Sequence, residues 1–287
     1  MVENEAQNEN IIIRNNYVID SSVGKIPVNE VTPARLKTNI PVVIVPGWSE
    51  SPNVFDLTQT VIANKNRRSL SFDHPRLGGE VKPNSDYPTP ELRKAYALLD
   101  LINNSGSDQV DIIAHSEGAI YTVIAASLQP EKFRNMVLLA PGGMIGEDTL
   151  GSLLGRLSKK IARNLKQGVT NPKTTNKVLH AQADALKYIA KNPLRASQEA
   201  VAISKSNIDK VLPHLRSKGI GVVIIHHSDD EGFPMHRIQK AVKEDQVDGI
   251  LAVTGLHDDM YIYPEKYTAA AEEMLSALEK KQAKRKL

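Results

Sequence analysis

Short runs of Val, Ile and Leu recur along the chain, separated by longer segments in which apolar residues repeat every three or four positions. The short runs are typical of strands buried on both faces of a parallel sheet, and the longer repeats of amphipathic helices. This alternation predicts an α/β fold with a mostly parallel sheet and helices on both faces. The predicted strands span residues 40–45, 68–72, 109–113, 135–140, 221–226 and 249–253.

The pattern changes at two places. Residues 11–31 alternate apolar and polar positions, which predicts an antiparallel hairpin at an edge of the sheet. Residues 146–215 have helical periodicity but no strand pattern, so we predict a helical cap inserted over the sheet. The α/β core is then formed by residues 1–145 and 216–287. The predicted cap helices lie around residues 150–165, 174–189 and 195–211.

Composition narrows the possible chemistry. The 287 residues include no Cys, which excludes disulfides, thiolate catalysis and metal sites built on Cys. Residues 1–10 are polar with three Glu, unlike a secretory signal, and no apolar run reaches the roughly 18 residues of a membrane helix. We therefore expect a cytoplasmic protein.

The formal net charge of +3 is unevenly distributed. Residues 151–220 hold 14 Lys/Arg and 3 Asp/Glu, and the basic tail ending at Lys286 is expected to extend a C-terminal helix. The basic insertion is either a set of solvated helix faces or a surface that attracts an anionic substrate or an anionic membrane. Nucleic acid is not expected as a partner, because Tyr188 is the only aromatic residue in this stretch.

A five-residue motif, Ala114-His-Ser116-Glu-Gly118, lies between a predicted strand and a predicted helix at residues 119–128. Small residues on both sides of a serine allow a tight strand-to-helix turn. Such a turn presents the serine oxygen at a helix N-terminus, where free N–H groups stabilise developing negative charge. The motif therefore predicts a nucleophilic serine.

With this motif the chain resembles the α/β-hydrolase superfamily, and the resemblance extends over nearly the whole length. Four further segments are similar to loops of that family, namely its oxyanion loop, its Asp-x-x-Gly loop, its acid loop and its histidine loop. These segments are residues 41–48, 71–78, 227–234 and 254–257.

The resemblance implies a catalytic triad and an oxyanion hole. Ser116 would be the nucleophile, His257 the general base and Asp230 the acid that orients it. The backbone N–H groups of Trp48 and Glu117 would form the oxyanion hole. The implied function is a serine hydrolase acting on a carboxylic ester or related acyl compound through an acyl-enzyme, with a small-molecule substrate and no cofactor.

Three positions leave the site assignment open. Asp229 competes with Asp230 for the role of the acid, and Asp148 after an earlier strand is a further candidate. Pro46 stands where many relatives carry His, so the oxyanion loop needs another support. The carboxylate of Glu117 opposes negative charge in the oxyanion hole unless it turns away or meets a cation.

Two other functions fit the same residues. A catalytically silent member of the fold would bind a small molecule in the same pocket without turnover. A metal-dependent hydrolase would use His226, Asp230 and His257, although their spacing matches no common zinc or two-metal motif. The chain has neither glycine-rich nucleotide-binding motif, Gly-x-Gly-x-x-Gly or Gly-x-x-x-x-Gly-Lys-Ser/Thr.

Overall fold

The structure is a computed structural model that describes residues 11–285 apart from 75–80, 85, 147, 171 and 244. The polar segment 1–10, Lys286 and most of the predicted Asp-x-x-Gly loop lie outside the described residues.

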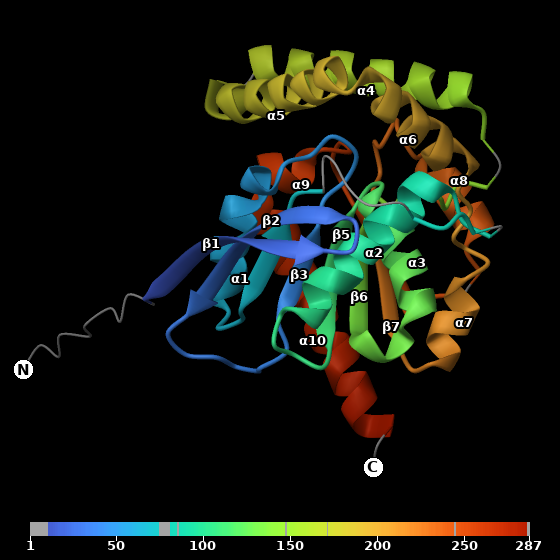
Figure 1. Cartoon of the computed structure of the whole chain (residues 1–287). Helices are drawn as coiled ribbons and strands as arrows, with labels where there is room; N and C mark the ends of the chain where they lie inside the picture. Colours follow the sequence, from blue (N-terminus) through green and yellow to red (C-terminus); the bar gives the residue numbers. More distant parts are fainter. Residues whose placement is uncertain are drawn as a thin grey trace, which may run out of the picture.

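One eight-stranded sheet forms the centre of the molecule, with strand order β1-β2-β4-β3-β5-β6-β7-β8 (Figure 1). The first two strands form the predicted antiparallel hairpin at one edge, and β2 pairs antiparallel with β4. All other neighbours are parallel, as the pattern of apolar runs predicts. The strands are β1 (Ile12–Ser21), β2 (Gly24–Pro33), β3 (Val42–Val45), β4 (Ser69–Phe72), β5 (Val110–His115), β6 (Phe133–Leu139), β7 (Gly221–His227) and β8 (Gly249–Val253).

Helices cover both faces of the sheet and create two apolar cores. On one face α2, α3, α7 and α8 pack against the sheet, and on the other α1, α9 and α10 do so. The bounds of these helices are α1 (Asp56–Asn64), α2 (Thr89–Asn103), α3 (Gly118–Leu128), α7 (Leu212–Ser217), α8 (Met235–Ala241), α9 (Asp259–Ile262) and α10 (Pro264–Arg285).

The burial of each element follows from its composition. The central strands β3, β4 and β5 are buried at every position because helices cover both of their faces. Helix α3 is apolar on nearly all sides and is buried from Gly118 to Ala126, as expected for a helix between the sheet and α2. The basic C-terminal tail extends α10 as far as Arg285.

Between β6 and β7, ahead of α7, three helices lie where the sequence predicts the cap. They are α4 (Leu150–Thr170), α5 (Pro172–Lys191) and α6 (Pro193–Lys205). Figure 1 shows α4 and α5 as a layer above the sheet, with α6 between that layer and the core. We use the word cap for these three helices. The division into core and cap at residues 146–215 stays a prediction, and α7 crosses its second boundary while packing on α3 and β7.

Two details of the sequence prediction are wrong. The third cap helix ends at Lys205 instead of continuing to Val211, because the Ile208 N–H donates to the carbonyl of Gly143 at 2.9 Å and turns the chain back to the core. Strand β8 is only half buried, because it forms the edge of the sheet in the described part of the chain. None of the helices formed by the described residues combines the length and apolar character that crossing a bilayer requires.

Candidate active site

Ser116 occupies a strained turn between β5 and α3. Its φ of 52° lies in the left-handed region, which costs free energy for a residue with a Cβ. The turn is possible because glycines surround it. A Cβ at Gly118 would lie 2.7 Å from the Val45 carbonyl oxygen, and one at Gly47 would lie 2.9 Å from the Cβ of Ser116. The small residues of the motif are thus a packing requirement.

The three residues assigned to the triad are joined by hydrogen bonds. The hydroxyl of Ser116 donates to Nε2 of His257 at 2.9 Å, and Nδ1–H of His257 donates to Oδ2 of Asp230 at 2.7 Å. All three residues are buried, although they come from three loops at the carboxyl ends of β5, β7 and β8. This arrangement can move a proton from the serine to the imidazole and stabilise the resulting positive charge.

The two neighbouring carboxylates after β7 differ in their surroundings. Asp230 is buried, and its Oδ1 accepts the backbone N–H of Phe233 at 2.9 Å. Burial raises the pKa of Asp230, but the charge and hydrogen bond of His257 outweigh it and lower that pKa to about 2. Asp229 is exposed and accepts from the Ser228 hydroxyl. The third candidate, Asp148, is paired with Arg156.

Two backbone N–H groups beside Ser116 have no acceptor in the described part of the protein. They belong to Trp48 and Glu117, the residues that the sequence assigns to the oxyanion hole. A free N–H group in a tight loop is the donor that an oxyanion requires.

Pro46 stands where many relatives carry His, and two hydrogen bonds hold the oxyanion loop here. The Tyr121 hydroxyl donates to the Pro46 carbonyl. The N–H of Gly47 donates to Oε2 of Glu50 at 2.5 Å, and Oε1 of the same carboxylate lies 2.6 Å from Nδ1 of His115. The loop is therefore fastened to the residue immediately before the serine.

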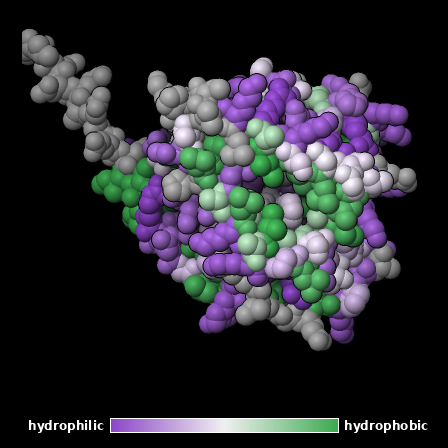
Figure 2. Space-filling view, turned by 90° about the horizontal axis from the view of Figure 1, so that it is seen from above, coloured by the Kyte–Doolittle hydropathy of each residue, from purple (hydrophilic) through white to green (hydrophobic). Residues whose placement is uncertain are grey.

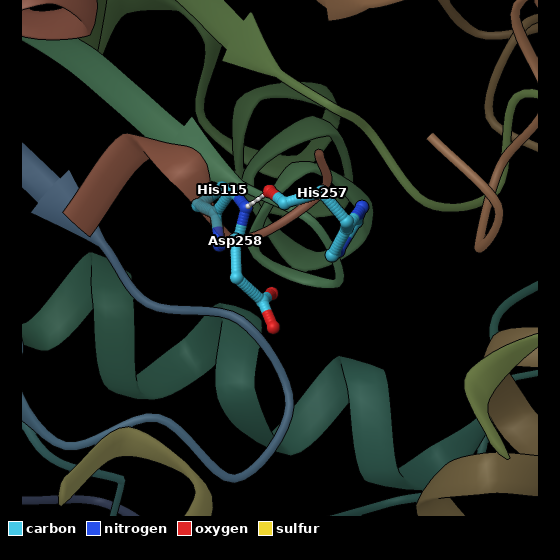
Figure 3. Close-up of side chains that lie close together, drawn as sticks. All are labelled: His115, His257 and Asp258. Carbon is cyan, nitrogen blue, oxygen red and sulfur yellow. Dashed lines mark hydrogen bonds between the residues drawn. The ribbon is translucent and has the colours of Figure 1, made fainter. Parts of the chain in front are cut away.

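His115 also contacts the histidine loop, as Figure 3 shows. Its Nε2 donates to the carbonyl of His257 at 3.0 Å, and its Nδ1 faces Glu50, so both ring nitrogens act as donors. Burial lowers the pKa of His115, but the Glu50 charge outweighs burial and raises it above its ordinary value. A charged His115 thus connects the oxyanion loop with the loop that carries His257.

The arrangement of donors does not favour a metal at this place. Among the described residues, one group of three has ligand atoms close enough to hold an ion, and it consists of His115, His257 and Asp258 (Figure 3). Their nitrogens and oxygens already serve hydrogen bonds, including one from Lys160 to Asp258 at 3.0 Å. In the predicted set of His226, Asp230 and His257, Nε2 of His226 donates to the Phe233 carbonyl instead.

Glu117 meets the cation that its position requires. Both of its carboxylate oxygens accept from Nζ of Lys94, at 2.6 and 2.7 Å, and both side chains are buried. Lys94 thereby compensates the charge of this carboxylate, which reduces its opposition to an oxyanion.

A small pocket opens above Ser116 under the cap, with a cavity volume of about 80 Å³. Its upper wall is mainly apolar and comes from α4, α5 and α6. The apolar residues of this wall are Leu153, Leu157, Ile161, Ala185, Ile189 and Ile203. The lining of this pocket favours an apolar group beside the serine.

Sequence reasoning misses Lys94, Glu50 and Glu199, which contact the neighbours of Ser116 or the oxyanion loop. One signal was present for the first of these. Lys94 and Glu91 follow the periodicity of the apolar face of α2, where charged residues are unusual. Such an interruption indicates a buried polar cluster, but it does not say which residues the cluster meets.

Comparisons with known proteins identify the family and the fold. Residues 40–241 match the family model described as alpha/beta hydrolase fold. No curated protein is significantly similar to the chain in sequence.

Several solved structures share the fold at low sequence identity. An esterase from Thermogutta terrifontis is 15% identical with a TM-score of 0.66, and the alignment covers 92% of this chain and 99% of the esterase. An esterase from Exiguobacterium antarcticum is 14% identical with a TM-score of 0.64, covering 92% and 100%. A bromoperoxidase from Bacillus anthracis is 15% identical with a TM-score of 0.64, covering 91% and 100%.

Proposed function

Because the chain belongs to the alpha/beta hydrolase fold family, we propose that it is a serine hydrolase that cleaves a carboxylic ester or related acyl compound through an acyl-enzyme on Ser116. The observation that carries this proposal is the hydrogen-bonded series from Ser116 through His257 to Asp230, at a strained turn below a pocket. A strained backbone conformation at a buried nucleophile is typical of functional sites.

The reaction runs in two halves. Ser116 Oγ attacks the acyl carbon while Nε2 of His257 takes its proton, and the same nitrogen then gives that proton to the leaving alkoxide. Water attacks the acyl-enzyme in the second half, with His257 again accepting a proton and returning it to Ser116. Asp230 keeps Nδ1 of the imidazole protonated and stabilises its charged form throughout.

Negative charge develops on the acyl oxygen in both halves. We expect the free N–H groups of Trp48 and Glu117 to receive it, and loss of one such donor typically costs about 10²- to 10³-fold in kcat. Lys94 supports this role because it neutralises the Glu117 side chain.

The pocket indicates the kind of acyl group. Its wall of Leu, Ile and Ala side chains favours an apolar acyl chain, and Lys160 at the same pocket is already paired with Asp258. The esterases among the structural relatives share the fold and are consistent with ester cleavage.

The proposal is tested with a fluorophosphonate probe, which forms a covalent bond only with an activated serine. The wild type should gain one probe mass and hydrolyse p-nitrophenyl esters, whereas Ser116→Ala should do neither. Ser127→Ala, at the far end of α3, is the matched control and should be labelled like the wild type. A wild type that neither reacts nor hydrolyses any ester would instead favour a ligand-binding protein without turnover. Activity that is lost on chelation and restored by a metal would favour the metal-dependent alternative.

A further inference from the structure

A cluster of buried ionisable side chains lies behind the serine and has no part in the proton transfers described above. It consists of Glu91 and Lys94 on α2, Glu117 at the turn and Glu199 on the cap helix α6. All four side chains are at most 3% exposed. Charged residues are rarely buried to this extent unless they are paired, so each contact in the cluster has structural consequences.

Glu199 is the centre of this cluster. Its Oε2 accepts the indole N–H of Trp48 at 3.1 Å and the Tyr188 hydroxyl at 2.6 Å. Its Oε1 accepts Nε of Arg195 at 3.0 Å and lies 3.2 Å from Nζ of Lys94. One carboxylate of the cap therefore contacts the oxyanion loop, α5, α6 and α2 at the same time.

The charges in the cluster depend on one another. Burial raises the pKa of Glu199, but Lys94, Tyr188 and Arg195 outweigh it and lower that pKa, so the group is ionised. Burial lowers the pKa of Lys94, but the surrounding carboxylates raise it above its ordinary value. Removal of Glu199 would take one of two carboxylates from the ammonium group of Lys94, which is buried.

Both residues of the predicted oxyanion hole are anchored in this cluster by their side chains. The indole N–H of Trp48 donates to Glu199, and the carboxylate of Glu117 accepts from Lys94, which in turn contacts Glu199. The two N–H donors belong to segments far apart in the sequence, so their relative position depends on such contacts. A displacement of about 1 Å at a reacting centre can cost on the order of 10²-fold in rate.

We propose that Glu199 is a positioning residue that couples the seating of the cap to the assembly of the oxyanion hole, acting through Trp48 and Lys94. This role rests on the proposed serine hydrolase function. When α6 packs on the core, Glu199 accepts the indole N–H of Trp48 and forms an ion pair with Lys94. When α6 is displaced, Trp48 loses the acceptor of its indole N–H, and Lys94, which holds Glu117, loses its contact with Glu199.

The catalytic test compares Glu199→Gln and Trp48→Phe with the wild type. Each variant should lower kcat by about 10-fold or more while KM stays within about twofold, because the oxyanion donors act on the transition state. The affinity for a boronic acid, which imitates the tetrahedral intermediate, should fall by the same factor. The kcat of the double variant should be about the same as that of the poorer single variant, because both changes break the same contact between Trp48 and Glu199.

Glu272→Gln is the matched control, because Glu272 is also buried and ion-paired, but with Arg67 near α10. It should lower stability while leaving kcat and boronic acid affinity unchanged. Fully additive effects in the double variant, or an unchanged kcat in folded Glu199→Gln, would overturn the proposal.

A second measurement does not depend on any hydrolase activity. Trp48 is the only tryptophan of the chain, so its fluorescence reports directly on this contact. Glu199→Ala and Glu199→Gln should shift its emission maximum and increase quenching by acrylamide, whereas Glu272→Gln should do neither. Unchanged fluorescence in folded Glu199 variants would contradict the coupling. If instead the fluorescence responds but the wild type does not react with the fluorophosphonate probe, the contact stands and the proposed hydrolase function fails.

Discussion

Two adjacent carboxylates, Asp229 and Asp230, follow β7 but face different surroundings. Asp230 is buried and bonded to His257, whereas Asp229 is exposed. We predict that Asp230→Asn lowers kcat by about 10⁴-fold, since loss of the carboxylate charge at this position destabilises the imidazolium. Asp229→Asn is the matched control and should stay within about threefold of the wild type in ester hydrolysis. The reverse result would move the acid to Asp229.

His227 makes the stability of the fold dependent on pH. Burial lowers its pKa from about 6.5 to about 3, with smaller contributions from nearby histidines. Between these two values the unfolded chain binds a proton that the folded chain does not, so the free energy of unfolding falls as the pH falls below 6.5. One proton corresponds to a slope of about 1.4 kcal/mol per pH unit.

Urea unfolding between pH 7 and pH 5 tests this contribution. We predict that the free energy of unfolding of His227→Leu depends less on pH than that of the wild type. The difference in slope should be at most about 1.4 kcal/mol per pH unit. Ile225→Val on the same strand should cost about 0.5–1.5 kcal/mol equally at both pH values, because it removes a buried methyl group and no titratable group. Parallel pH profiles for the wild type and His227→Leu would contradict the prediction.

Residues of the site differ in how far the sequence identifies them. Ser116, Asp230 and His257 each follow a strand whose apolar run is visible, so their convergence at one edge of the sheet can be predicted. The contact between Trp48 and Glu199 joins residues 151 positions apart. It depends on how the cap lies on the core, which no local pattern encodes.

Helices and strands also differ in how far the sequence predicts them. The six predicted strand runs all correspond to strands, because a short apolar run bounded by turn residues is typical of a strand. The end of α6 could not be predicted, because it is set by the hydrogen bond from Ile208 to Gly143 in another loop. The half-burial of β8 depends on strand order, which the sequence leaves open.

Helix α4 supplies the part of the pocket wall that limits the acyl chain. Leu157 lines the pocket on this helix, together with Leu153 and Ile161. We predict that Leu157→Trp shifts the preference of kcat/KM toward shorter acyl chains, because the larger ring fills space that a long chain would occupy. A series of p-nitrophenyl esters from acetate to decanoate measures this. Leu179→Trp, on the exposed surface of α5, is the control and should leave the preference unchanged.

At the scale of the whole molecule, the basic residues of the insertion form two groups, one ion-paired at the site and one exposed on the surface. Lys160 and Arg195 are paired with Asp258 and Glu199 and contribute to the site. Other basic residues are exposed on the cap, where Figure 2 shows hydrophilic areas around hydrophobic ones on the upper face of the molecule. Contact of this face with an anionic membrane surface stays a prediction.

Two exposed lysines of α5, Lys187 and Lys191, lie beside Ser49 and Glu50 of the oxyanion loop in a shallow pocket. We predict that kcat/KM for an anionic ester falls several-fold as salt rises from about 0.01 to 0.1 M, over which the Debye length shrinks from about 30 to 10 Å, while a neutral ester is unaffected. Lys187→Gln with Lys191→Gln should weaken this salt dependence, and Lys218→Gln, directly after α7, should not. An equal response of both esters to salt would leave these lysines as solvated side chains.

The contact of Glu199 with the core also limits how this protein can be recombined with its relatives. A cap grafted from another member of the family would leave the buried Lys94 without the carboxylate that Glu199 supplies, and the Trp48 indole without an acceptor. A functional chimera therefore has to bring a carboxylate to the same place, or replace Lys94 and Glu117 in the same step. The cap is not an exchangeable module here, and substrate range and oxyanion hole are expected to change together during evolution.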